Sequence, residues 1–157
     1  MDKACAACHG KGSLRKMRKI EVAIPRGVGD GQFLRIAGEG EAGTDHGPPG
    51  DLYAVVHVRK DPRFDRQGAD LYSTAEVGLA TALLGAEITV PTITGSATLR
   101  IPAGTQCQTL FRLRSQGMPL LNAEGRGDLM VKVMVRIPAH LTKKQEGLIR
   151  EALAGSS

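Results

Sequence analysis

Two cysteines near the start of the chain have the spacing of a metal-binding knuckle. Cys5 and Cys8 form a CxxC pair, and Gly10 and Gly12 extend the pattern to CxxCxGxG. Two thiolates on a glycine-rich turn can hold a tetrahedral zinc ion from one side. Structural zinc needs four ligands, and His9 is poorly placed to be the third because it is adjacent to Cys8. The pattern predicts half of a zinc site, with a thioredoxin-like redox pair as the alternative.

The other residues with reactive side chains do not form a catalytic set. Cys107 stands alone, which is typical of a small buried or loop residue. The four histidines are scattered and have no neighbouring nucleophile or carboxylate pair. The glycines of residues 29–40 resemble a nucleotide-binding loop only superficially, because no helical pattern follows them. The sequence therefore predicts a protein that is not an enzyme.

The basic residues in excess are concentrated in one stretch. The net charge is +5, and five of the 21 basic residues lie in residues 11–19, where there is no acidic residue. The rest of the chain has equal numbers of basic and acidic residues, 16 of each. No aromatic residue precedes Phe33, whereas nucleic-acid binders usually interleave basic and aromatic side chains. We expect a solvated basic strand or linker rather than a nucleic-acid site. Without a long apolar run or a signal peptide, the expected protein is cytoplasmic and has no membrane partner.

An internal repeat organises most of the chain. The stretch IPRGVGDGQFLRIAGEG begins at Ile24, and the weaker copy IPAGTQCQTLFRLRSQG begins at Ile101, 77 residues later. Gly50-Asp51-Leu52 recurs at the same distance as Gly127-Asp128-Leu129. A constant offset without gaps indicates two copies of one structural unit. With 157 residues, the chain then holds two small domains of roughly 70 residues each.

Hydrophobic alternation and turn residues predict mostly short strands. In the first copy we expect strands at residues 19–25, 33–36 and 52–59, followed by a polar connector at 64–68. In the second copy we expect strands at 70–77, 86–90, 96–101, 110–113 and 129–137, with a short helix at 79–84 that ends at Gly85.

The last residues change character and predict a helix. Thr142 and Gln145 form a capping box. An apolar stripe follows on a helix of about 12 residues, and its members are Leu148, Ile149, Ala152 and Leu153. A lone helix of this length is marginal in water, so the stripe should pack on the second unit or on another subunit.

The repeat register also predicts a missing part. In the second copy a strand, a helix and a strand precede the Ile-Pro motif, whereas the counterpart region of the first copy falls on the cysteine knuckle or before residue 1. We therefore expect the first unit to lack its leading strands and to expose a sheet edge. The chain reads as a fragment that begins inside a cysteine-rich insertion.

Taken together, these motifs resemble the C-terminal substrate-binding region of the zinc-containing DnaJ family of J-domain co-chaperones. The resemblance covers nearly the whole chain. It rests on CxxCxGxG, Ile-Pro-Arg-Gly-Val, Ala-Gly-Glu-Gly-Glu-Ala-Gly, Gly-Asp-Leu-Tyr, Ala-Leu-Leu-Gly, Val-Pro-Thr and the second Gly-Asp-Leu. It implies an all-β fold with minor α content, made of two tandem small β-sandwich domains and a C-terminal helix. The implied segments are a zinc-finger remnant at 1–14, C-terminal domain I at 15–69, C-terminal domain II at 70–140 and a helix at 141–157 that is a candidate for dimerisation.

The resemblance also implies cofactors and partners. Cys5 and Cys8 correspond to two of four zinc ligands, and because the partner cysteines are absent we expect no zinc on this chain alone. The implied partners are unfolded client polypeptides, a DnaK-type chaperone and a second copy, joined through the helix or through exposed strand edges. No His-Pro-Asp motif is present, so stimulation of ATP hydrolysis is not expected.

The expected function is the binding of extended hydrophobic polypeptide by β-augmentation and shallow apolar pockets. The resemblance places the principal pocket in the first sandwich, where the candidate residues are Ile20, Val22, Leu34, Ile36 and Phe64. A weaker second pocket would use Leu99, Phe111 and Leu113. The competing interpretation is that these alternating apolar residues are core. A zinc- or thiol-dependent adaptor or dimerisation module is the alternative function.

Overall fold

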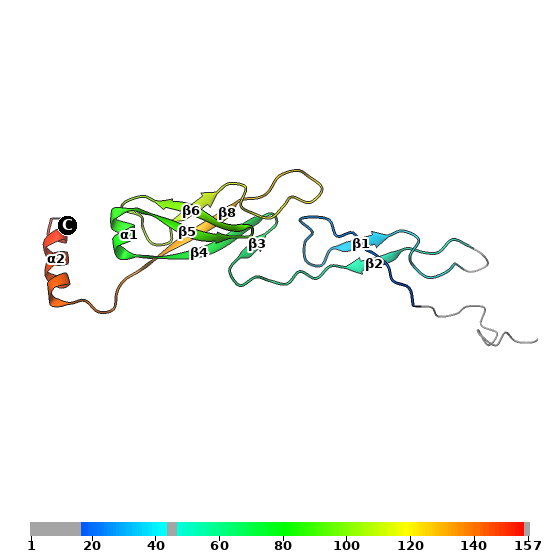
Figure 1. Cartoon of the computed structure of the whole chain (residues 1–157), viewed down its shortest axis with the longest axis horizontal. Helices are drawn as coiled ribbons and strands as arrows, with labels where there is room; N and C mark the ends of the chain where they lie inside the picture. The colour runs from blue at the N-terminus through cyan, green and yellow to red at the C-terminus, as the bar shows by residue number, and fades with distance from the viewer. Residues whose placement is uncertain (1–16, 44–46, 156–157) are drawn as a thin grey trace, which may run out of the picture. The chain divides into compact units, whose positions relative to one another are not determined.

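The computed structural model describes residues 17–43 and 47–155, which form an all-β structure with two short helices (Figure 1). The predicted fold class is thus confirmed. The described chain divides into two compact units. Unit 1 contains the described residues as far as Ile24 together with Gln32–Val56, and unit 2 contains Pro25–Gly31 and the residues from His57 onward.

Unit 2 is built from two sheets. The larger one has the strand order β3-β4-β8-β7 and contains β3 (Asp65–Gln67), β4 (Asp70–Gly78), β7 (Leu110–Leu113) and β8 (Leu129–Arg136). β4 and β8 are parallel, and the other two pairs are antiparallel. The smaller sheet is the antiparallel pair of β5 (Ala86–Thr92) and β6 (Gly95–Ile101), which lies along the larger one in Figure 1.

One hydrophobic core joins these sheets to helix α1 (Leu79–Leu84). Alternate residues of β4, β6 and β8 point inward, as the two-residue period of a strand requires. The buried residues are Leu71, Val77, Ala82, Val90, Leu99, Ile101, Leu129, Val131 and Val133. All of them belong to unit 2, which therefore has a complete core of its own.

Helix α1 has the predicted bounds and ends as predicted. Gly85 follows it with φ of 78°, and the Gly85 amide donates to the Thr81 carbonyl oxygen at 2.9 Å. A side chain at Gly85 would lie 2.9 Å from the Ala103 nitrogen and the Ile101 carbonyl oxygen. Both the positive φ and the close backbone approach favour glycine here.

Unit 1 contains one antiparallel pair, β1 (Phe33–Ile36) and β2 (Leu52–Val55). The structure confirms the internal repeat, because β7 lies 77 residues after β1 and the pairing register is the same. Leu34 faces Ala54 in unit 1, and the equivalent Phe111 faces Val131 in unit 2. The loops between the strands are closed by equivalent hydrogen bonds. The amide of Gly40 donates to the carbonyl oxygen of Gly50, and the amide of Gly117 donates to the carbonyl oxygen of Gly127, both at 2.8 Å.

One predicted strand is wrong: residues 19–25 form no strand in the structure. Their counterpart in unit 2 is β6, which is paired along its whole length with β5. The counterpart of β5 in the first copy falls on residues 9–15, outside the described residues. No strand within the described ranges pairs with residues 18–24, so the alternating pattern alone does not produce a strand.

Two further predictions change in the structure. The expected polar connector at 64–68 contains strand β3, which pairs with β4 through Arg66 and Leu71. The expected strand at 52–59 ends at Val55, because β2 has only β1 beside it in the described chain. Both changes depend on which strand is available as a pairing partner.

The boundaries of the two units differ from the expected boundary between domains, which lies between residues 69 and 70. Pro25–Gly31 and residues 57–69 lie with unit 2. Arg66 holds the first of these segments, because its guanidinium donates to the carbonyl oxygens of Val28 at 2.9 Å and Gly27 at 2.8 Å. The assignment of two domains to residues 15–69 and 70–140 stays a prediction.

The predicted C-terminal helix is present as α2 (Lys143–Leu153). Thr142 and Gln145 form the predicted capping box, with the side chain of each accepting from the backbone amide of the other. No residue of α2 is buried, and Leu148 and Leu153 are exposed. What covers the apolar stripe stays a prediction.

Candidate functional site

Four of the predicted binding residues lie in unit 1, and all four are half-buried. Leu34 and Ile36 are alternate residues of β1, so they share one face of the pair with Ala54 and Leu52 of β2. Ile20 and Val22 lie on the segment that precedes the pair in the same compact unit. Arg18, at the start of that segment, forms an ion pair of 3.2 Å with Glu39.

Comparison with unit 2 shows how exposed the apolar residues of this segment are. The counterparts of Val22 and Ile24 are Leu99 and Ile101, which lie in the core of unit 2. Ile24 is 66% exposed, whereas Ile101 is 1% exposed. In unit 2 the inner faces of the two sheets pack against each other. In the described part of unit 1 there is a single strand pair, and no second sheet covers the equivalent face. Unit 1 therefore offers apolar surface that unit 2 has buried.

The remaining predicted residues are in unit 2. Phe64 packs against the core and lies beneath the Arg63 guanidinium, whose central carbon is 5.2 Å from the ring centroid. Leu99 is part of the core, and Phe111 and Leu113 pack against it. These side chains stabilise unit 2 in the described structure. Their expected roles in binding stay predictions.

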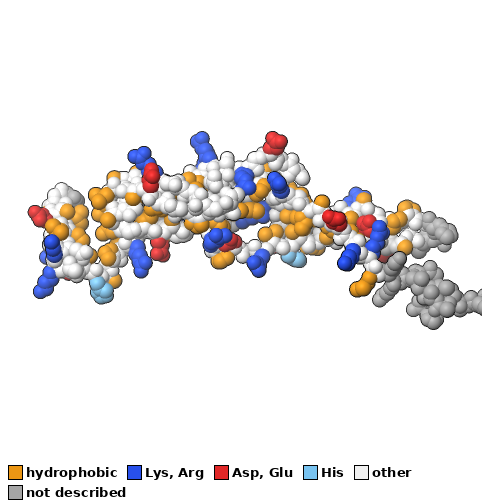
Figure 2. Space-filling view, in the orientation of Figure 1, with side chains coloured by type: hydrophobic (Ala, Val, Ile, Leu, Met, Phe, Trp, Pro, Cys, Tyr) orange, Lys and Arg blue, Asp and Glu red, His pale blue; other side chains and the backbone are white. Residues whose placement is uncertain are grey.

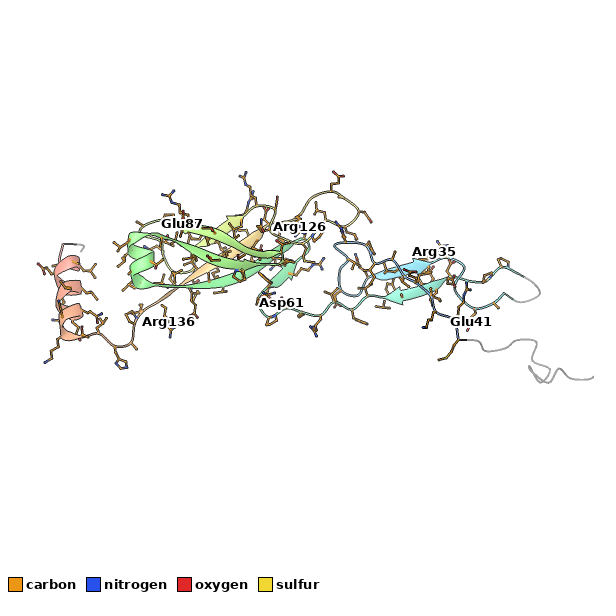
Figure 3. All side chains as sticks on the ribbon, in the orientation of Figure 1. Arg35, Glu41, Asp61, Glu87, Arg126 and Arg136 are labelled. Carbon is orange, nitrogen blue, oxygen red and sulfur yellow. The ribbon has the colours of Figure 1, made fainter. Side chains whose placement is uncertain are left out.

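The strand pair of unit 1 is held at one end by a charged cluster. Nε of Arg35, labelled on β1 in Figure 3, lies 2.6 Å from the carboxylate of Asp51, which also accepts from the Gly38 amide at 3.0 Å. The bond from Gly38, followed by the bond from Arg35, lowers the pKa of Asp51 below its usual value. The bond to Asp51 in turn raises the pKa of Arg35. Unit 2 repeats the ion pair as Arg112–Asp128, at 3.1 Å.

The opposite face of the pair carries an apolar group that the sequence interpretation did not single out. Phe33, Tyr53 and Val55 share this face and are exposed. The visible surface of unit 1 in Figure 2 mixes hydrophobic with charged side chains. The signal was present in the alternation of FLRI and LYAV, in which both sets of alternate positions contain large apolar residues. This face also carries Arg35, so large apolar side chains lie on both faces of the pair and are mixed with charge on one of them.

The described residues contain no metal centre and no membrane-spanning helix. Within residues 17–43 and 47–155, no three His, Cys, Asp or Glu side chains gather in a way that could hold a metal ion. No helix in these ranges is long and apolar enough to cross a bilayer. Cys107 is a free, exposed thiol. Cys5 and Cys8 lie outside the described residues, so the half zinc site stays a prediction.

Comparisons with known proteins agree with the repeat and the fold. Residues 7–138 match the family described as the DnaJ C terminal domain. The chain is 49% identical over 147 residues to Chaperone protein DnaJ of Bacillus cytotoxicus, and these residues make up 94% of this chain and 40% of the relative. It is 45% identical over 149 residues to Chaperone protein DnaJ of Clostridium novyi, covering 95% of this chain and 40% of the relative. The chain thus spans less than half the length of these relatives. From its match over residues 7–138, the chain belongs to the DnaJ C-terminal domain family.

Proposed function

We propose that this chain is the client-binding part of a cytoplasmic co-chaperone and that it binds unfolded polypeptides through unit 1. The observation that carries the proposal is that Val22 is half-buried, whereas its counterpart Leu99 lies in the core of unit 2, and that Ile20, Leu34 and Ile36 of the same unit are also half-buried. The relatives that are named chaperones support the same role.

An unfolded polypeptide presents unpaired backbone groups and scattered apolar side chains. A free strand edge satisfies the backbone groups, and a shallow apolar layer takes up the side chains. Unit 1 has both features, because β1 and β2 each have one free edge in the described chain and the layer beside them is half-exposed. Because neither feature depends on a particular side chain of the client, the site suits many sequences.

Weak binding at one site becomes useful when several sites act together. Dimerisation through α2 or through strand edges would place two copies of unit 1 on one client, and avidity would then exceed the affinity of either copy. Release to a DnaK-type chaperone is the step that the family membership suggests. Cys5 and Cys8 would supply only two of the four ligands that structural zinc needs, so no zinc is expected on this chain alone.

The test is to place a charge in the apolar layer. Val22→Asp should reduce capture of a permanently unfolded, carboxymethylated protein at least tenfold, because a buried carboxylate opposes apolar contact. Val55→Asp is the matched control, since Val55 lies in the same unit on the face of the strand pair opposite to Leu34 and Ile36. Both variants should keep the circular dichroism spectrum. Equal capture by the Val22→Asp variant and the unaltered chain would rule out this site, and unfolding of that variant would identify Val22 as a core residue.

A further inference from the structure

The turn after the first Ile-Pro motif is bound to unit 2 through its backbone carbonyl groups. Pro25–Gly31 lies with unit 2, although its sequence belongs to the first copy of the repeat. From strand β3, the two terminal nitrogens of Arg66 donate to the carbonyl oxygens of Gly27 at 2.8 Å and Val28 at 2.9 Å. The third guanidinium nitrogen, Nε, donates to the carbonyl oxygen of Gly68 at 2.8 Å. One half-buried side chain thus binds three carbonyls, which the planar fork of a guanidinium can do and a lysine ammonium cannot reproduce.

The second copy of the repeat satisfies the same carbonyl group from within its own turn. Gly104 is the counterpart of Gly27, and the two residues have φ of 77° and 80°. The carbonyl oxygen of Gly104 accepts from the side-chain amide of Gln106 at 3.1 Å. The counterpart of Gln106 in the first copy is Gly29, which has no side chain that could donate. Arg66 therefore supplies from β3 the hydrogen bond that the second turn obtains locally.

The first turn also packs against a loop of unit 2. A Cβ on Gly27 would collide with the carbonyl oxygen of Pro119 and would lie 3.0 Å from the amide nitrogen of Leu121. A Cβ on Gly104 would meet no described atom within 4 Å. Because both glycines have positive φ, an alanine at either position introduces the same kind of backbone strain. Only at Gly27 does a close contact with a second segment add to that strain.

A carboxylate makes the third contact of this turn. Asp30 accepts from the backbone amide of Val58 at 2.8 Å. Both residues lie in unit 2, whereas the amide of Val56 donates to the carbonyl oxygen of Gln32 within unit 1. The Val58 amide is protected from solvent exchange by this bond only while Asp30 is in place. It is therefore a direct reporter of the position of the turn.

The contacts that hold the turn are separate from the core of unit 2. No residue of Pro25–Gly31 is buried, and none belongs to the core cluster. Release of the turn would break hydrogen bonds and backbone packing without exposing a core side chain. Segments held in this way open at a lower free energy than the strands that carry a core.

We propose that Pro25–Gly31 is a latch on unit 2, which opens and closes while the core stays folded, and that Arg66 holds it closed. In the closed state the latch is fixed by Arg66, by the loop at Pro119 and by the bond from Asp30 to Val58. In the open state these groups are hydrated, and Pro25–Gly31 becomes a flexible connection in the chain. The latch involves contacts within unit 2 alone, so it does not depend on the client-binding proposal.

Amide hydrogen exchange of the intact chain, measured by nuclear magnetic resonance, tests the latch. Val58 reports the latch, and Leu71, whose amide donates to the Asp128 carbonyl oxygen at 2.9 Å, reports the core sheet. Arg66→Ala should speed exchange at Val58 by about tenfold or more and leave exchange at Leu71 unchanged, because the latch opens below the free energy of core unfolding. Arg66→Lys should behave like Arg66→Ala, because it keeps the charge and loses the fork. Chemical shifts of Asp65–Gln67 verify that β3 remains paired in both variants.

The two equivalent glycines provide the matched pair of variants. Gly27→Ala should speed exchange at Val58 as much as Arg66→Ala does, whereas Gly104→Ala should leave it unchanged. Unchanged exchange at Val58 in the Arg66 and Gly27 variants would refute the latch. Equal acceleration at Val58 and Leu71 would also refute it, because the turn and the core would then open together. An equal effect of Gly104→Ala at Val58 would assign the change to backbone strain and overturn the role of the loop contact.

Discussion

Replacing Leu129 by alanine should destabilise unit 2 severely, whereas the repeat-equivalent change at Leu52 should leave it intact. Leu129 is fully buried in a core whose members all belong to unit 2. A Leu→Ala change at such a site costs about 2–5 kcal/mol, because the lost transfer free energy and the cavity add. Leu52 belongs to unit 1 and is 36% exposed. Its truncation removes nothing from the core of unit 2.

The two tyrosines allow each unit to be followed separately. Tyr53 lies on β2 in unit 1 and Tyr72 lies on β4 in unit 2, and the chain has no tryptophan. In a Tyr53→Phe background, tyrosine fluorescence therefore reports the urea unfolding of unit 2 alone. With a slope of about 1.5 kcal/mol per molar urea, a loss of about 3 kcal/mol lowers the midpoint by about 2 M.

The expected result is a shift of about 2 M for Leu129→Ala and a change in unfolding free energy below about 0.5 kcal/mol for Leu52→Ala. An equal shift for the two variants would refute the reasoning, because it would mean that the units share one core. A small shift for Leu129→Ala would contradict the complete burial of that side chain.

Two further predictions concern a carboxylate and a helix cap. The side-chain bond from Arg63, followed by the bond from the Arg63 amide, lowers the pKa of Asp61 to about 2. Because this folded pKa is below the unfolded value, the ion pair stabilises the fold above the ordinary pKa range of aspartate, and this contribution is lost as the pH falls toward 2. Arg63→Ala should raise the titration midpoint of Asp61 toward about 3.9, as measured from the carboxyl carbon resonance. Thr142→Ala should lower the helicity of α2, because it removes a cap worth about 1 kcal/mol, whereas Thr142→Ser should keep the helicity. Backbone chemical shifts of Lys143–Leu153 measure this helicity. Equal chemical shifts in the two variants would contradict the role of the hydroxyl.

Local sequence patterns predicted the elements that depend on local chemistry. Helix α1 has its predicted limits because Gly85 supplies the positive φ that ends it. The capping box before α2 formed because Thr142 and Gln145 are three residues apart. The repeat predicted the relation between the strand pairs, since identical spacing of Arg35 and Asp51, and of Arg112 and Asp128, produces the same ion pair twice.

The candidate site could be predicted only in part, because burial depends on neighbours from elsewhere in the chain. Val22 and Leu99 occupy equivalent positions in the repeat and have similar apolar side chains. Leu99 is buried because β5 pairs with its strand and the larger sheet closes the other side. Val22 is half-exposed in a segment without a described strand partner. No pattern within residues 19–25 distinguishes these two situations.

By itself, the sequence determined the fold class, the two copies of the repeat, the position of the helices and the family, because turn residues, caps and the 77-residue offset are local or internally comparable features. Only the tertiary structure decided that unit 2 closes its core, whereas within the described residues the strand pair of unit 1 has no second sheet over its apolar face. The physical reason is that the hydrogen-bond pairing and the burial of a strand depend on residues from other parts of the chain that pack beside it. Equivalent residues therefore become core in one copy and accessible surface in the other.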